Sequence, residues 1–117
     1  MQPRERDRVL ILDMIDQAEI VASFVAGRAR ADLDRDRMLF YALVRAIEVM
    51  GEAASQLSSA TRVAEPHIPW RQIIGLRNRL IHAYAQVDAD IVWTVATVDV
   101  PAMLPALRVL TRTDEGE

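Results

Sequence analysis

The sequence has 117 residues, of which 51% are hydrophobic, and carries a formal net charge of −3. This apolar content excludes an intrinsically disordered chain, and the acidic balance argues against a broad basic face that coats nucleic acid. The absence of cysteine excludes a disulfide scaffold and thiolate metal sites. We therefore expect one all-α domain over residues 1–117, since helix-favouring residues dominate the composition.

Nothing in the sequence predicts export or membrane insertion. The first eight residues mix acidic and basic side chains, which is unlike a secretory signal peptide. The uncharged stretches are too short to cross a bilayer as they stand. The expectation is a soluble, cytoplasmic protein with no membrane segment.

Helical periodicity is clear in the first half of the chain. We expect a first helix over residues 4–26 and a second over 37–58, because apolar residues recur at helical spacing. Gly27 and the charged run that follows predict a loop, and residues 58–69, with two prolines, predict another. The apolar stripe expected on the second helix comprises Leu39, Leu43, Ile47, Met50, Ala54 and Leu57.

The second half of the chain predicts shorter helices. A third helix is expected over residues 70–85, with Pro69 suited to its first position. Asp88 is expected to cap a fourth helix, and a last short helix ends near Thr111. An interruption between these two is predicted by Asp99, Pro101 and Pro105. Four or five helices joined by short loops predict an antiparallel bundle.

The expected third helix carries polar chemistry within an apolar segment, since residues 77–84 read Arg-Asn-Arg-Leu-Ile-His-Ala-Tyr. On a helical wheel Arg77 lies in the middle of the apolar arc, where a charge needs an acid, a carbonyl, a partner chain or a ligand phosphate. Alternatively, its stem packs and its head reaches water. His82 lies about 140° from Arg77 on a straight helix, so a groove or a second chain is needed to bring the two together.

The neighbours of His82 leave more than one interpretation open. Asn78 lies four residues earlier and could orient the imidazole, while Tyr84 shares the face of Arg77. Equally, His82 could be a surface or capping residue, and Tyr84 a core-edge residue with a hydrated hydroxyl. No zinc-ligand spacing, calcium loop or phosphate-cradling glycine loop occurs, so neither a metal nor another cofactor is expected.

Several motifs, taken together and in order, resemble the HepT-like branch of the HEPN superfamily. In the expected second helix the matching stretch is Gly51-Glu52-Ala53-Ala54. The matching positions further along are Ile68-Pro69-Trp70, Arg77-Asn78, Ile81-His82, Tyr84, Val87-Asp88, Val92-Trp93, Asp99-Val100-Pro101 and Leu104. The similarity spans most of the chain.

This resemblance implies a HEPN-like helical bundle that forms a homodimer, in which the Arg-x4-His motifs of two protomers line one cleft. It also implies the toxin of a HepT–MntA type toxin–antitoxin pair, acting on RNA as a metal-independent endoribonuclease. Carried over by position, Arg77 and His82 are the catalytic pair and Asn78 is their polar neighbour. Tyr84 would accept AMP groups from an MntA-like nucleotidyltransferase antitoxin.

Two other hypotheses stay open. The bundle could be a non-catalytic binding or assembly partner of a nucleotidyltransferase, which suits the acidic balance slightly better than RNA binding does. Arg77 could instead have a structural role in a dimer, paired with an acid such as Glu52 or Glu48.

Overall fold

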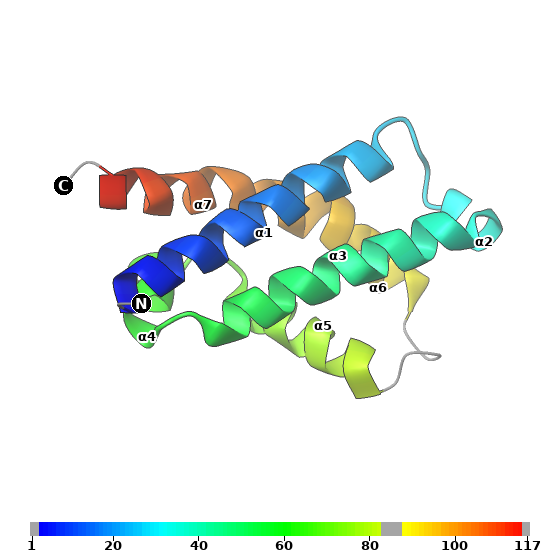
Figure 1. Ribbon diagram of the computed structural model, residues 1–117. Helices are drawn as coiled ribbons and strands as arrows, with labels where there is room; N and C mark the ends of the chain where they lie inside the picture. The colour runs from blue at the N-terminus through cyan, green and yellow to red at the C-terminus, as the bar shows by residue number, and fades with distance from the viewer. Residues whose placement is uncertain (1–2, 83–87, 116–117) are drawn as a thin grey trace.

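The computed structural model describes residues 3–82 and 88–115, with side chains described within 5–79 and 88–112. The described residues form helices and no strand, so the predicted all-α class is confirmed (Figure 1). Two long helices, α1 (Pro3–Val25) and α3 (Arg37–Gln56), run antiparallel to each other at the centre. Helix α7 (Val100–Glu115) packs on α1, and α5 (Trp70–His82) packs on α3. Helix α5 therefore lies at one edge of the bundle.

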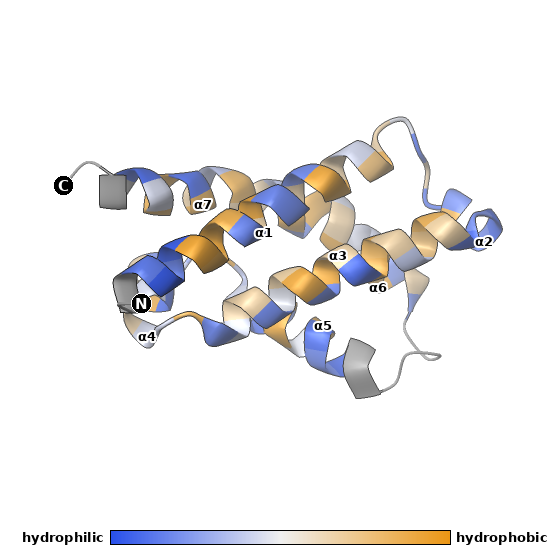
Figure 2. Cartoon of the chain, in the orientation of Figure 1, coloured by the Kyte–Doolittle hydropathy of each residue, from blue (hydrophilic) through white to orange (hydrophobic). Residues whose placement is uncertain are grey.

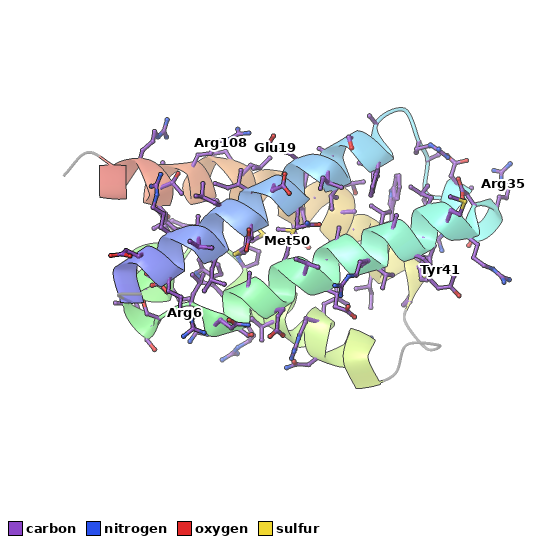
Figure 3. All side chains as sticks on the ribbon, viewed as in Figure 1. Arg6, Glu19, Arg35, Tyr41, Met50 and Arg108 are labelled. Atoms are coloured by element: carbon purple, nitrogen blue, oxygen red, sulfur yellow. The ribbon has the colours of Figure 1, made fainter. Side chains whose placement is uncertain are left out.

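The apolar stripe predicted for the second helix forms the centre of the core. All six of its residues are buried, five of them in α3 and Leu57 at its C-cap, and Met14, Ala18 and Val21 of α1 are buried against them. Figure 2 shows this pattern as apolar bands on helices whose other faces are hydrophilic. In Figure 3, Met50 lies between α1 and α3, whereas Arg108 and Glu19 form an ion pair at the surface between α7 and α1.

Both loops predicted from the sequence contain a short helix. Gly27, whose φ is 72°, ends α1, and α2 (Asp32–Arg35) follows within the charged run. Helix α4 (Ser59–Ala64) lies in the segment that was expected to be a loop because of its prolines. The Ser58 hydroxyl accepts a hydrogen bond from the Thr61 backbone N–H and so caps α4. Capping, rather than an apolar stripe, stabilises such a short helix.

The interruption predicted at Asp99, Pro101 and Pro105 is wrong. Helix α6 (Ala89–Thr94), the π-helical turn η2 (Val95–Asp99) and α7 form one continuous helix. A proline lacks the N–H that would bond four residues back, and its ring crowds that carbonyl. The wider π turn ends at Asp99, two residues before Pro101, and includes residue 97, whose carbonyl the ring of Pro101 would otherwise crowd. The predicted cap at the start of α6 is confirmed, since the Asp88 carboxylate accepts from the Asp90 N–H at 2.7 Å.

The continuous helix Ala89–Arg112 is long and apolar enough, by length and composition, to cross a bilayer. The sequence prediction missed this because it counted the stretches on either side of Asp99 separately. In this helix Val92, Met103 and Leu107 are buried in the core of the bundle.

A buried carboxylate connects the start of α1 to the start of α4. Asp7 is only 7% exposed and accepts hydrogen bonds from the Ser58 hydroxyl (2.6 Å), the Ser58 N–H (3.2 Å) and the Thr61 hydroxyl (2.6 Å). Burial alone would raise the pKa of Asp7, but the hydrogen bonds from Ser58 and Thr61 together outweigh it and hold the pKa below its ordinary value. The folded state therefore favours the ionised form.

We expect Asp7→Asn to lower the free energy of unfolding by about 2 kcal/mol at neutral pH, because a charged acceptor of three hydrogen bonds is lost. A pKa that is lowered on folding contributes stability above the unfolded value, and that contribution is lost as the pH falls through the folded value. The difference between wild type and variant should thus shrink below about pH 4. Urea unfolding at pH 7 and pH 3 measures this difference in the free energy of unfolding. The control is Asp16→Asn, because Asp16 is exposed on the same helix. An equal loss at both pH values would contradict this account.

Candidate functional site

The start of α5 is fixed by Trp70. Its side chain is buried, and the indole Nε1–H donates to the carbonyls of Arg62 (3.1 Å) and Glu65 (3.0 Å). Trp70 is therefore an anchor in the core at the start of the helix. Pro69 stands just before the helix rather than at its first position, and its carbonyl accepts the first helical hydrogen bond from Ile73. These contacts set the direction in which α5 crosses α3.

Gly51 allows α5 to approach α3 closely at Arg77. A Cβ added at Gly51 would lie 2.3 Å from Cβ of Arg77 and 2.8 Å from the carbonyl oxygen of Ile73. Atoms do not approach that closely, so the crossing requires a residue with no side chain. The stem of Arg77 consequently packs against the backbone of α3, which places its guanidinium beside the residue after Gly51.

The guanidinium of Arg77 has two polar partners. Its Nη2 forms an ion pair with the Glu52 carboxylate, and its Nη1 donates to the side-chain oxygen of Asn78 at 2.9 Å. The Arg77 side chain remains 26% exposed. The pairing of Arg77 with Glu52, one of the two acids suggested by the sequence, is thus confirmed. Its stem packs against α3 as the alternative interpretation expected, but its head is bound by Glu52 and Asn78 rather than directed into water alone.

Glu52 is itself held by neighbours on α3 and α1. The Gln56 side chain donates to Glu52 at 2.8 Å, and Arg6 of α1 donates to Gln56 at 3.0 Å. This chain of hydrogen bonds links three helices and ends at Arg77. It restrains the carboxylate, and the carboxylate in turn restrains the guanidinium.

An open groove of about 430 Å³ lies beside Arg77, between α1, α3 and α5. Its charged lining consists of Asp13, Arg45, Glu48, Glu52 and Arg77, which is three acids against two arginines. Arg45 is already paired with Glu48 at 2.6 Å. We name this the acidic groove; its charge disfavours the approach of phosphate from the α3 side.

The other predicted site residues fall partly or wholly outside the described structure. The backbone of His82 forms the last residue of α5, but its side chain lies outside the described residues. Tyr84 lies outside them altogether, as does the expected end of this helix at residue 85. The predicted hydrogen bond between Asn78 and His82 therefore stays a prediction. His67, the other histidine of the chain, is exposed in the loop before α5.

The sequence interpretation gave no role to Gly51, although a signal for one was present. A glycine inside a helix costs about 1 kcal/mol relative to alanine, so its place on the apolar stripe of α3 indicates a close approach by another element. Arg6 and Gln56 carried no comparable signal, because their hydrogen bond joins positions 50 residues apart.

Comparisons with known proteins agree with the resemblance seen in the sequence. A family model described as "Ribonuclease HepT-like" matches residues 14–110, which include all of α3 and α5. A "Putative RNase" of Methanocaldococcus jannaschii is 32% identical over 94 residues, 80% of this chain and 86% of its own length. The "Probable ribonuclease HepT" of Thermococcus cleftensis is 31% identical over 91 residues, 78% of this chain and 83% of its own. No solved structure gives a significant match.

Proposed function

The chain belongs to the ribonuclease HepT-like family, and from that premise we propose that it is a metal-independent endoribonuclease, the toxin of a toxin–antitoxin pair. The observation that carries the proposal is the placement of Arg77. Its side chain is partly exposed and held by Glu52 and Asn78, within the segment that matches the family. A fixed guanidinium at a surface suits a reaction in which charge develops on a phosphate.

In the proposed reaction RNA supplies its own nucleophile. The 2′-hydroxyl attacks the adjacent phosphorus, neutral His82 accepts its proton, and the 5′-oxygen of the next nucleotide leaves with a proton from a protonated histidine. Arg77 stabilises the negative charge that builds on the phosphoryl oxygens. The bond to the 5′-oxygen breaks as the bond to the 2′-oxygen forms, which leaves a cyclic phosphate and a free 5′-hydroxyl.

We propose that two protomers share the catalytic cleft. Positions 77 and 82 are about 140° apart on a straight helix, so one helix does not direct both side chains to one point. Two copies related by a two-fold axis supply two arginines and two histidines, and one histidine accepts a proton while the other donates one. The homodimer is thus part of the proposed mechanism.

We further propose that a nucleotidyltransferase antitoxin transfers AMP to Tyr84 and so neutralises the toxin. Tyr84 follows Arg77 by seven residues, which in a continued helix is the same face. The added group carries bulk and negative charge, so it blocks the cleft and repels RNA phosphates. The expected chemistry is an O–P bond to the phenol with loss of pyrophosphate from ATP.

The test compares wild-type protein with His82→Ala, each purified with and without its nucleotidyltransferase. We expect wild type to cleave a labelled oligoribonucleotide in the presence of EDTA and to arrest growth, and His82→Ala to do neither while it unfolds at the same temperature. Mass spectrometry of the co-expressed protein should find AMP on Tyr84, and Tyr84→Phe should escape neutralisation.

Equal cleavage by wild type and His82→Ala would contradict the ribonuclease assignment. A stable complex with AMP on Tyr84, but no cleavage by either form, would instead favour the non-catalytic partner.

A further inference from the structure

A second groove lies on the other side of α5, away from the acidic groove. It has a volume of about 490 Å³ and runs between α5 and the continuous last helix, where α6 passes into η2. Arg71, Gly75 and Arg79 of α5 line it, and its apolar part is formed by Leu76, Ile91 and Val95. Part of its wall is thus the π-helical turn, a distortion that often occurs at functional sites.

The charge of α5 differs from that of the remaining chain. The helix contains three arginines and no acid, whereas the whole chain carries −3. Two of these arginines, Arg71 and Arg79, are exposed at the second groove and form no ion pair within residues 5–79 and 88–112. Asp90 on the opposite wall is already bound by Arg30, whose Nε lies 2.5 Å from its carboxylate. The groove therefore presents two arginines and one other acid, Asp99.

Gly75 keeps the middle of this groove open. A Cβ added there would meet no atom within 4 Å, in contrast to Gly51, so packing does not require glycine at this position. Glycine inside a helix lowers stability relative to alanine. The space beside Gly75 is therefore open to another molecule and has room for more than a methyl group.

The groove also leads towards the proposed catalytic histidine. Position 82 follows Gly75 by seven residues and Arg71 by eleven, and these separations place all three backbone positions on one face of α5. Asn78, four residues before position 82, is on that face as well. A strand of RNA that lies along this groove would reach position 82 on the same face of α5. Arg77 of the same protomer lines the acidic groove, so in the proposed dimer the second protomer supplies the arginine at this end of the strand.

We propose that the second groove binds single-stranded RNA next to the scissile bond. Arg71 and Arg79 bind successive phosphates, and one unstacked base lies on the apolar surface of Leu76, Ile91 and Val95. Asp99 is placed to accept a hydrogen bond from an amino group of that base, as carboxylates do with cytosine. This inference rests on the proposed ribonuclease function, but RNA binding can be measured separately from cleavage.

The test measures binding of a fluorescein-labelled single-stranded oligoribonucleotide to the full chain carrying His82→Ala, over a range of salt concentrations. One phosphate contact to single-stranded RNA contributes roughly 0.7 to the slope of log affinity against log salt, or roughly eightfold in affinity at 50 mM salt. Adding either Arg71→Ala or Arg79→Ala should lower the salt slope by roughly 0.7 and the affinity roughly eightfold. Adding both substitutions should lower the affinity roughly 60-fold. Arg112→Ala removes the same charge from an exposed site on α7 and should leave both quantities unchanged.

A second pair of variants tests the groove itself rather than its charge. Gly75→Leu places a bulky side chain in the open space and should weaken RNA binding at least tenfold, while Gly75→Ala should change it less than twofold. Circular dichroism and the melting temperature establish that both variants fold.

The groove assignment is overturned if His82→Ala does not bind RNA, or if the arginine variants keep the wild-type salt slope. Unchanged RNA binding with a change in molecular mass by light scattering would assign the groove to a protein interface instead. A failure of the ribonuclease proposal looks different, because wild-type protein would then bind RNA with the predicted slopes and not cleave it.

Discussion

Replacing Arg77 with alanine is expected to lower the rate of RNA cleavage about 100- to 1,000-fold, the usual cost of removing one donor that stabilises transition-state charge. The fold should survive, because the Arg77–Glu52 pair is partly exposed and such pairs contribute little to stability. Lysine should not restore activity. A single ammonium group cannot pair with Glu52, bind Asn78 and contact a phosphate in the planar arrangement of a guanidinium.

The rate is best measured in single-turnover cleavage of a labelled oligoribonucleotide, with the melting temperature recorded for each variant. Arg108→Ala is the matched control, since Arg108 also belongs to a partly exposed ion pair, at 3.5 Å from Glu19 on the opposite side of the bundle (Figure 3). A purely structural Arg77 predicts another outcome. Arg77→Met would then raise the melting temperature and leave cleavage at the wild-type rate.

Glu52 influences how strongly Arg77 can bind a phosphate. Its carboxylate holds the guanidinium in place, and that contact competes with a phosphate for the same N–H groups. The hydrogen bond from Gln56 reduces this competition by occupying one oxygen of the carboxylate. Glu52 thus acts on the proposed reaction through Arg77 and is a positioning residue.

Those features of the fold that depend on one helix at a time could be predicted from the sequence. The stripe from Leu39 to Leu57 repeats at helical spacing, so the buried face of α3 followed directly from it. The continuity of the last helix could not be predicted in this way. Whether a proline ends a helix depends on the backbone conformation of the preceding turn. The π turn Val95–Asp99 cannot be recognised from the spacing of apolar residues.

The partner of Arg77 could be anticipated from the sequence, but the geometry around it could not. The wheel placed Arg77 on the apolar arc and so required an acid or another partner, and Glu52 was one of two acids suggested for it. The choice between Glu52 and Glu48 depends on the register of α5 against α3, which no single-helix pattern contains. Gly51 sets that register through its close contact with Arg77. The second groove was missed for the same reason, since it lies between two helices.

Replacing Gly51 with alanine should therefore affect both stability and the site. The new Cβ would lie 2.3 Å from the Arg77 Cβ and 2.8 Å from the Ile73 carbonyl, and neither atom belongs to a flexible chain end. The helices must separate, at a cost of about 3 kcal/mol, the upper part of the usual range for overpacking. That loss is a large fraction of the stability of a domain of this size. The displaced guanidinium would also lose its alignment with Glu52.

Denaturant unfolding of Gly51→Ala and Gly75→Ala separates this steric effect from helix propensity. Both variants place the same methyl group in a helix interior, where alanine is favoured over glycine by about 1 kcal/mol. Gly75→Ala should be as stable as wild type or more so, because its Cβ meets nothing within 4 Å. If Gly51→Ala were stabilised to the same extent, the close crossing of α3 and α5 would be wrong. The positioning of Arg77 by α3 would then have no physical basis.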